Sequence, residues 1–327
     1  MRSLGLSPYE DNTASVTGSN TGNIICKVNG GGNFVLVAHM DTIYSTKGVK
    51  PVLLDDRITS DDTTILGADN RLGIAVILYA IKNAIEQNIP IRPFTIAFTT
   101  CEETTLLGSK NIELDKAIAS GFVFDSPLVP GHFVDQGVGV IGFEVKIKGR
   151  AGFISNSSAN ATQIAVEAFS NYPFGNTATN VIANIGFTDG ENAVNAASNF
   201  IMPHGELQSF SRTLVEEHAE RIKQIFAKAA EKYGGAVEYD AAWKFKPYHL
   251  VVTTEPYKRI LDIFKSLRLK PKASISQGGC DANLLNERGI RTINLGVGIH
   301  KQHTNEEFVL LKDLENAIEI TYRLIKF

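Results

Sequence analysis

The chain has 327 residues, of which 43% are hydrophobic and 20% charged, and its formal net charge at pH 7 is −3. This length allows two domains, and the nearly balanced charge gives no reason to expect nucleic acid or an anionic membrane as a partner. No apolar run approaches the roughly 18 residues of a membrane-spanning helix, and the first residues lack the apolar stretch of a secretory signal, so we expect a cytoplasmic protein.

The first 140 residues alternate between two kinds of element. Residues 34–38, 94–99 and 121–124 are short, almost continuous apolar runs, which is typical of strands buried on both faces. Between the first two, residues 68–87 carry apolar side chains at helical spacing, and Pro90 follows their end. This alternation predicts an α/β sheet covered by helices.

The middle of the chain has a different pattern. Residues 142–149 alternate strictly between apolar and polar side chains, which indicates a strand with one solvated face. Two helices and further strands are expected after it, and together they predict an α+β insert of about a hundred residues, a usual domain size. The expected helices are 161–169 and 213–233, and the expected strands are 180–188, 198–210 and 236–248.

The remainder returns to the α/β pattern, with helices expected at 256–267 and 312–326 and a strand at 292–296. The predicted architecture is therefore a mixed-sheet α/β domain, made of residues 1–141 and 249–327, interrupted by an α+β domain of residues 142–248. A cleft between two such units is a common place for a ligand.

Polar side chains follow the predicted strands. His39 and Asp41 lie two residues apart after the first strand, so they can face one site, with the carboxylate orienting the imidazole. By itself this pair is a weak signal, because surface histidines are common. Asp69 precedes the first helix between Gly67 and Gly73, where it is ordinarily a helix cap but can also bridge two cations.

Glu102 and Glu103 follow the second strand. Two adjacent glutamates there are costly unless solvent or a metal satisfies them, so they form either a solvated turn or a metal ligand beside a general base. Asp125 ends the third strand, and His303 lies in a loop after a glycine-rich segment. The cysteines, Cys26, Cys101 and Cys280, are too far apart for a disulfide framework or a thiolate metal site, and we expect them to be buried.

Five of these residues form a joint pattern. His39, Asp69, Glu103, Asp125 and His303 all lie at strand ends or in loops of the same predicted domain. In open α/β sheets, sites form outside the carboxyl ends of the strands. Two imidazoles and three carboxylates suit two divalent, zinc-like ions.

At these segments the chain resembles the peptidase T-like (tripeptidase) branch of the zinc aminopeptidase, carboxypeptidase and aminoacylase superfamily. The resemblance covers essentially the whole chain, and its segments occur in the family's order. They are AHMDT at 38–42, GADNRLG at 67–73, TTCEE at 99–103, Asp125, GGCDAN at 278–283, NLGVG at 294–298 and HT at 303–304.

The resemblance implies roles for the predicted site residues. Asp69 would bridge two metal ions, most simply Zn²⁺, with Co²⁺ or Mn²⁺ as alternatives. Glu102 would be the general base and Asp41 would orient His39. The resemblance further implies that His39 and Asp125 complete one metal site, that Glu103 and His303 complete the other, and that Asn195, Gly298 and Gln208 contact substrate.

Two positions depart from the family's pattern in the inserted domain. Phe153 stands about where the family has a histidine that polarises the scissile carbonyl, and Gln208 stands where it has an arginine for the substrate carboxylate. Neither change touches the metal ligands. We therefore expect metal binding to persist while the peptidase rate falls.

The resemblance implies a zinc metallopeptidase that hydrolyses short peptides, of the aminopeptidase or tripeptidase type. It also implies that the first domain is catalytic and that the insert is a lid that forms a homodimer. Two alternatives stay open: a deacylase or other amidohydrolase with a non-peptide substrate, and a weakly active or non-catalytic metal-binding paralogue.

Overall fold

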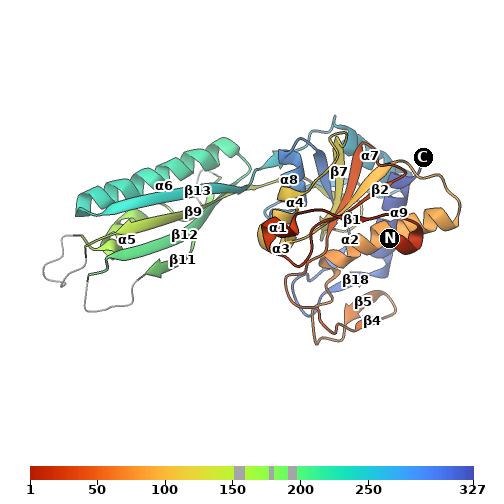
Figure 1. Cartoon of the computed structure of the whole chain (residues 1–327), viewed down its shortest axis with the longest axis horizontal. Helices are drawn as coiled ribbons and strands as arrows, with labels where there is room; N and C mark the ends of the chain where they lie inside the picture. The colour runs from red at the N-terminus through yellow and green to blue at the C-terminus, as the bar shows by residue number, and fades with distance from the viewer. Residues whose placement is uncertain (151–158, 177–179, 191–196) are drawn as a thin grey trace. The chain divides into compact units, whose positions relative to one another are not determined.

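The computed structural model describes residues 1–150, 159–176, 180–190 and 197–327. The chain divides into two compact units (Figure 1). The first unit comprises Met1–Gly137 and Tyr248–Phe327, and the second comprises Val138–Pro247, against the 142–248 expected from the sequence. Each unit has its own hydrophobic core.

The first unit is built on a nine-stranded mixed sheet. Its order is β1-β2-β6-β3-β7-β16-β8-β14, with β15 paired to β8. In its centre, β3 runs parallel to β6 and β7, whereas β2 is antiparallel to β6. β8 is antiparallel to β16 and β14 but parallel to β15. The strands are β1 (Tyr9–Glu10), β2 (Ile24–Val28), β3 (Phe34–His39), β6 (Phe94–Thr99), β7 (Ser120–Ser126), β8 (His132–Gly137), β14 (Tyr248–His249), β15 (Lys272–Ser276) and β16 (Arg291–Gly296).

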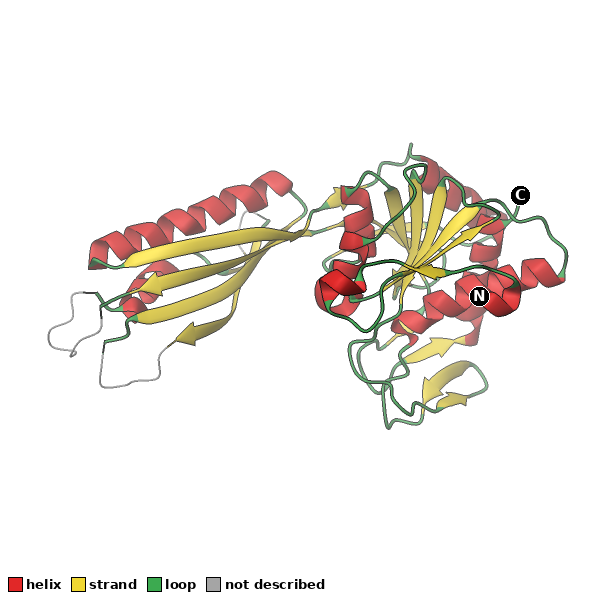
Figure 2. Ribbon diagram, in the orientation of Figure 1, coloured by secondary structure: helices red, strands yellow, loops and turns green. Residues whose placement is uncertain are grey.

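Helices cover both faces of this sheet (Figure 2). Along β3, Phe34 and Leu36 pack into the core beneath α2 (Ala68–Glu86), α7 (Glu255–Ser266) and α9 (Leu311–Ile325). Val35 and Val37 point the other way, into the core beneath α4 (Leu107–Asn111) and α8 (Asp281–Glu287). Successive side chains of a strand face opposite sides, so a strand covered on both sides has a continuous apolar sequence.

A second, four-stranded sheet belongs to the same unit and was not anticipated from the sequence. Its order is β17-β18-β5-β4, and all its pairs are antiparallel. The strands are β4 (Pro51–Leu53), β5 (Arg57–Ser60), β17 (Ile299–His300) and β18 (Phe308–Leu310). The turn between β17 and β18 contains His303, so this small sheet positions one of the predicted metal ligands.

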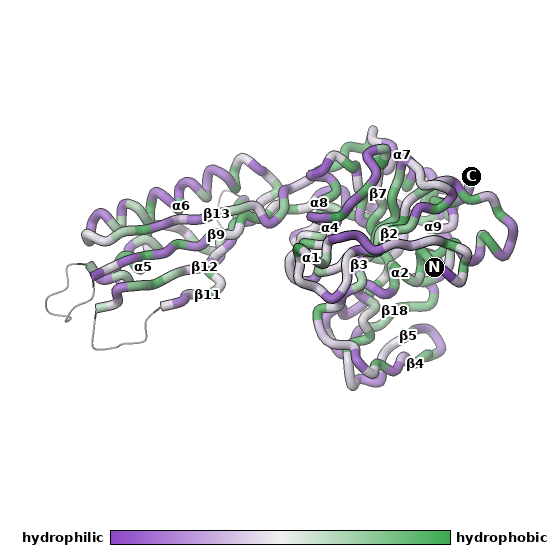
Figure 3. Tube along the Cα trace, in the orientation of Figure 1, coloured by the Kyte–Doolittle hydropathy of each residue, from purple (hydrophilic) through white to green (hydrophobic). Residues whose placement is uncertain are grey.

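The second unit is an antiparallel sheet in the order β10-β11-β12-β9-β13, with two helices on it. Ile141, Phe143, Val145 and Ile147 of β9 are buried against the helices, and in Figure 3 the trace of α6 alternates between hydrophilic and hydrophobic residues. The elements are β9 (Gly139–Lys148), α5 (Ala161–Ser170), β10 (Gly175–Asn176), β11 (Ile182–Gly190), β12 (Phe200–Ser209), α6 (Arg212–Tyr233) and β13 (Ala236–Phe245).

The predicted fold class, a mixed-sheet α/β domain with an inserted α+β domain, is confirmed. The alternating strand β9 is internal to its sheet, hydrogen-bonded to β12 and β13 on its two sides. Cys101 is partly exposed, whereas Cys26 and Cys280 are buried as expected. The short helices are η1 (Arg2–Leu4), α1 (Ala14–Thr17) and α3 (Glu102–Thr105). Among the described residues, no helix combines the length and apolar character needed to cross a membrane.

Candidate metal centre

The five predicted metal ligands come together at the carboxyl edge of the main sheet. His39 is the last residue of β3, Asp125 lies near the end of β7, and Glu103 lies in α3, which follows β6. Asp69 stands at the beginning of α2, and His303 lies in the turn between β17 and β18. Parallel strands carry their following loops to the same edge, which explains how residues so distant in sequence meet.

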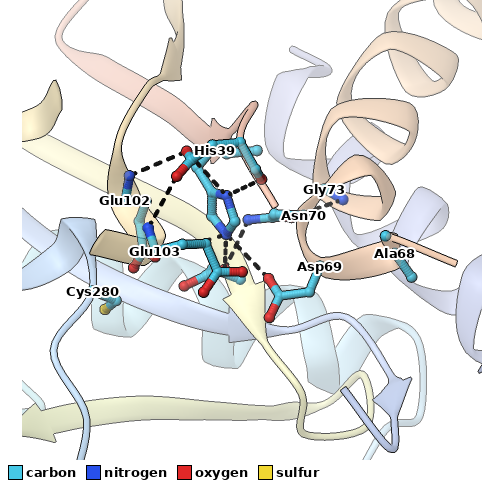
Figure 4. Close-up of polar contacts among 12 residues, drawn as sticks. His39, Ala68, Asp69, Asn70, Gly73, Glu102, Glu103 and Cys280 are labelled. Carbon is cyan, nitrogen blue, oxygen red and sulfur yellow. Dashed lines mark hydrogen bonds and ion pairs between the residues drawn. The ribbon is translucent and has the colours of Figure 1, made fainter. Parts of the chain in front are cut away.

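The ligand atoms form two groups that share one residue. In the first, His39 Nε2 lies 3.1 Å from Asp69 Oδ1 and 3.2 Å from Asp125 Oδ1. In the second, His303 Nε2 lies 3.1 Å from Asp69 Oδ2 and 3.4 Å from Glu103 Oε2. Within each group the potential ligand atoms are all within 4.8 Å of one another. Asp69 therefore offers one carboxylate oxygen to each group. Figure 4 shows the contact between Asp69 and His39.

The electrostatics of these groups fit divalent cations. Burial, together with the negative charge of Asp69, raises the pKa values of Glu103 and Asp125. Although burial opposes protonation of His39, its hydrogen bonds with Asp125, Asp41 and Asp69 raise the pKa of the imidazole well above its usual value. Glu103 Oε1 is buried without a hydrogen-bond partner among the described residues. A metal ion would neutralise the crowded carboxylates and satisfy that oxygen.

Asp41 differs in detail from its predicted role. The nearest acceptor for His39 Nδ1 is the backbone carbonyl of Asp41, at 2.9 Å, while its carboxylate oxygen is 3.6 Å away. The carboxylate instead accepts hydrogen bonds from the backbone N–H groups of Glu102 and Glu103, both at 3.1 Å. A proton on Nδ1 leaves Nε2 free as a ligand atom. Asp41 thus holds both the imidazole and the turn that carries the two glutamates.

Glu102 lies beside the first group, with its Oε2 3.9 Å from His39 Nε2. Burial, followed by the negative charge of Asp125, raises the pKa of Glu102 well above its usual value. A carboxyl group with a raised pKa beside candidate metal ligands has the properties of a proton acceptor and donor.

Sequence reasoning missed a supporting residue, Asn70. Its amide donates a hydrogen bond of 2.9 Å to Asp125 Oδ1 and accepts one of 3.1 Å from Gly73 N. The peptide bond between Asp69 and Asn70 is cis. A Cβ on Gly73 would lie only 2.4 Å from Asn70 Oδ1, so this position needs glycine. The GADNRLG segment contained both residues, but their role depends on contacts that the pattern alone does not give.

Two of the three predicted substrate-binding residues, Gly298 and Gln208, lie in the part of the chain that the structure describes. Gly298 has a φ of 80°, and a Cβ there would be 2.5 Å from Asp313 Cβ, so its absence of a side chain allows a tight turn against α9. Gln208 belongs to the second unit, where its amide donates a hydrogen bond of 3.1 Å to Glu206 Oε1. Asn195 and Phe153 fall outside the described residues.

Comparison with known proteins gives concordant matches across both units. A model of peptidase family M20/M25/M40 matches residues 35–326. The chain is 29% identical over 334 residues to the uncharacterized protein YqjE of Bacillus subtilis, covering 99% of this chain and 89% of YqjE. Two crystal structures are also similar, each with 28% identity over 99% of this chain and 89% of the other: the aminopeptidase PepT from Bacillus cereus, with a TM-score of 0.90, and a tripeptidase from Staphylococcus aureus, with a TM-score of 0.91.

Proposed function

The chain belongs to peptidase family M20/M25/M40, and on that basis we propose that it is a two-metal peptidase that hydrolyses the amide bonds of short peptides, of the aminopeptidase or tripeptidase type. The observation that carries this proposal is the pair of ligand groups sharing Asp69, with Glu102 beside them. The names of the two similar solved structures, an aminopeptidase and a tripeptidase, support the same reaction and substrate class. In this proposal the first unit is catalytic and the second is a lid.

The ligand set indicates which residues would hold each ion. His39, Asp125 and one oxygen of Asp69 would hold the first, and Glu103, His303 and the other oxygen of Asp69 the second. Nitrogen and oxygen ligands of this kind suit Zn²⁺, and Co²⁺ or Mn²⁺ are alternatives. Bound divalent ions polarise the scissile carbonyl and lower the pKa of water.

The chain's own groups supply the proton transfers. Glu102 would accept a proton from the attacking water on its carboxylate and return it to the leaving amine. The carboxylate of Asp41 fixes the backbone of Glu102, and its carbonyl fixes the ring of His39. General acid–base catalysis of this kind contributes about 10²–10⁴-fold in rate, so replacing Glu102 by Gln should remove nearly all turnover.

On the substrate side, we propose that Asn195 and Gly298 contact the peptide and that Gln208 stands where a cation would bind its carboxylate. Without that cation, about 1.5–3 kcal/mol of binding is lost. If Phe153 replaces a donor to the oxyanion, the rate falls by about 10²–10³-fold. We therefore expect slow hydrolysis of tripeptides.

A second candidate is a deacylase or other amidohydrolase with a non-peptide substrate. The observation that favours it is the neutral amide of Gln208, which donates to Glu206 and offers no positive charge for a peptide carboxylate. The third candidate is a paralogue that binds metal without catalysis. Phe153 and Gln208 favour it, because they stand where the family has residues needed for full peptidase activity.

One experiment separates the three. Tripeptides, C-terminally amidated tripeptides and N-acyl amino acids are incubated with the protein and Zn²⁺ or Co²⁺, and Glu102→Gln serves as the blank. We expect metal-dependent tripeptide cleavage that amidation of the C-terminus hardly reduces. Cleavage of the N-acyl amino acids alone would favour the deacylase, and no difference from Glu102→Gln on any substrate would favour the paralogue.

We also propose a cytoplasmic homodimer formed through the second unit. Since β9 is internal, the longer edge strand among the described residues of this sheet is β13, whose hydrogen bonds run to β9 on one side. An exposed edge strand presents unpaired N–H and C=O groups that can pair with a second copy. Light scattering at micromolar concentration should give twice the mass of one chain, and the mass of a single chain would contradict the proposal.

A further inference from the structure

Glu307 is a fully buried acid outside the set of candidate metal ligands. Its residue surface is 0% exposed, and a buried carboxylate needs strong partners to be tolerated. The Glu307 carboxylate has three hydrogen-bond partners, all of them backbone N–H groups. Glu307 Oε2 accepts from Gly67 at 2.6 Å and from Ala68 at 3.2 Å, and Oε1 accepts from Asp69 at 3.1 Å.

The segment that Glu307 binds lies at the start of α2 and departs from helical geometry. Asp69 and Asn70 have non-helical dihedral angles (φ −82°, ψ 100° and φ −122°, ψ 36°), although they stand at the start of α2. Gly67 has a φ of 67°. The N–H groups of such a segment lack helical acceptors, and a buried N–H group without a partner is costly. The carboxylate of Glu307 therefore determines the backbone position from which Asp69 projects.

The other end of Glu307 is anchored in the hairpin that carries His303. Its N–H donates to the carbonyl of Thr304 at 3.1 Å, and its own carbonyl accepts from the hydroxyl of Thr59 on β5 at 3.3 Å. The next residue begins β18. Glu307 thus joins two chain segments whose side chains, Asp69 and His303, meet 3.1 Å apart.

We infer that Glu307 is a positioning residue for the two-metal centre: its carboxylate fixes the backbone of Asp69 so that each Asp69 oxygen faces a different metal site, and fixes the His303 turn to the same segment. This inference rests on the proposed function for the presence of the two ions. A carboxylate is required because three N–H donors need two acceptor oxygens. In Glu307→Gln one oxygen becomes an NH₂ group, so at least one backbone N–H faces a donor instead of an acceptor.

The test is Co²⁺ binding by the full-length protein, followed by titration calorimetry and by the visible absorption of the bound ion. Residues that orient metal ligands typically change affinity by about 10–100-fold when mutated. We expect Glu307→Gln to weaken binding at both sites by that factor and to alter the Co²⁺ spectrum. Glu306→Gln is the matched control, because the neighbouring glutamate is exposed and pairs with Lys301 at 3.0 Å, and this variant should bind Co²⁺ like the wild type.

A second pair of variants isolates the effect on Asp69. With His303→Ala as background, the site formed by His39, Asp69 and Asp125 is titrated alone, and adding Glu307→Gln should still weaken it. A purely structural role would lower the thermal midpoint of the metal-free protein and leave Co²⁺ affinity unchanged. Glu307→Asp, which keeps the charge but shortens the side chain, should weaken both sites in the same direction and serves if Glu307→Gln does not fold.

The outcomes distinguish this inference from the proposed function. A wild-type protein that binds no Co²⁺ would overturn the proposed function, and this inference with it. A wild-type protein that binds two ions, with Glu307→Gln binding them equally tightly, would overturn this inference alone. A third outcome would also overturn this inference: Glu307→Gln weakens Co²⁺ binding at the site that includes His303, but it does not weaken binding at the remaining site in the His303→Ala background. Asp69 would then be positioned without Glu307.

Discussion

Replacing Asn23 by Ala should destabilise the first unit and loosen the turn before Glu102. Asn23 is 0% exposed and its side chain makes four hydrogen bonds. Its NH₂ group shares its two hydrogens among three acceptors, the carboxylate of Asp11 at 2.9 Å, the hydroxyl of Thr13 at 2.9 Å and the carbonyl of Gly108 at 3.0 Å. Its oxygen accepts from the N–H of Thr100 at 3.1 Å. One side chain thus joins the N-terminal segment, α4 and the end of β6.

The size of the effect follows from what Asn23→Ala leaves unpaired. The carbonyl of Gly108 and the N–H of Thr100 would remain buried, and each unpaired buried group costs about 1–3 kcal/mol. The carboxylate of Asp11 keeps its bonds from the backbone N–H groups of Thr13 and Asn23. For the two groups together, we therefore expect the unfolding free energy to fall by about 2–6 kcal/mol.

Urea unfolding followed by far-UV circular dichroism is the appropriate measurement, because the single tryptophan, Trp243, reports on the second unit instead. Asn305→Ala is the control: Asn305 is exposed in the first unit and makes one hydrogen bond, of 3.2 Å, to the carbonyl of Asp62. Its loss should change stability by no more than about 0.5 kcal/mol. Equal midpoints for the two variants would show that the Asn23 network does not stabilise the unit as argued.

Three further predictions concern the metal centre, the rate and pH. Asp69→Ala should lower metal occupancy at both sites and His303→Ala mainly at one, as measured by elemental analysis; two ions per chain in Asp69→Ala would contradict the sharing of that residue. Phe153→His combined with Gln208→Arg should raise the rate of tripeptide hydrolysis, and rapid turnover by the unmodified chain would refute our interpretation of Phe153. For Asp11, burial opposes ionisation, but the hydrogen bonds to its carboxylate prevail and lower its pKa in the folded state. The contribution of Asp11 to the unfolding free energy is therefore present above its unfolded pKa and is lost as pH falls through the folded pKa. Urea unfolding between about pH 5 and pH 2 should therefore show a steeper loss of stability in the wild type than in Asp11→Asn.

The main sheet could be predicted because its strands have a strong sequence signal. The residues of β3 and β6 are buried throughout, and that burial requires continuous apolar runs. The rule that sites form at the carboxyl ends of parallel strands then singled out His39, Glu103 and Asp125, which the structure brings to one edge. Burial determines the apolar composition of these strands, and the end of each buried strand marks where the polar residues begin. Both features could therefore be predicted from the sequence.

Other features depend on contacts that leave no such signal. The strands of the small sheet are two to four residues long, too short for a periodic pattern. Alternation in β9 identified its buried face, but hydrogen-bonding neighbours are independent of that pattern, so its central place was missed. Glu307 looks like any acidic loop residue beside Glu306 in the sequence, and only the folded structure shows that one is buried and the other exposed.

The division of the hydrophobic core between the two units has a consequence for how this protein changes over evolutionary time. All five candidate metal ligands lie in the first unit, whereas Gln208 lies in the second, whose buried side chains pack among themselves. Substitutions in the second unit can therefore accumulate without repacking the core on which the metal ligands are mounted. In the proposed function, where the second unit contacts the substrate, substrate preference could therefore change while the residues that would hold the ions stay in place.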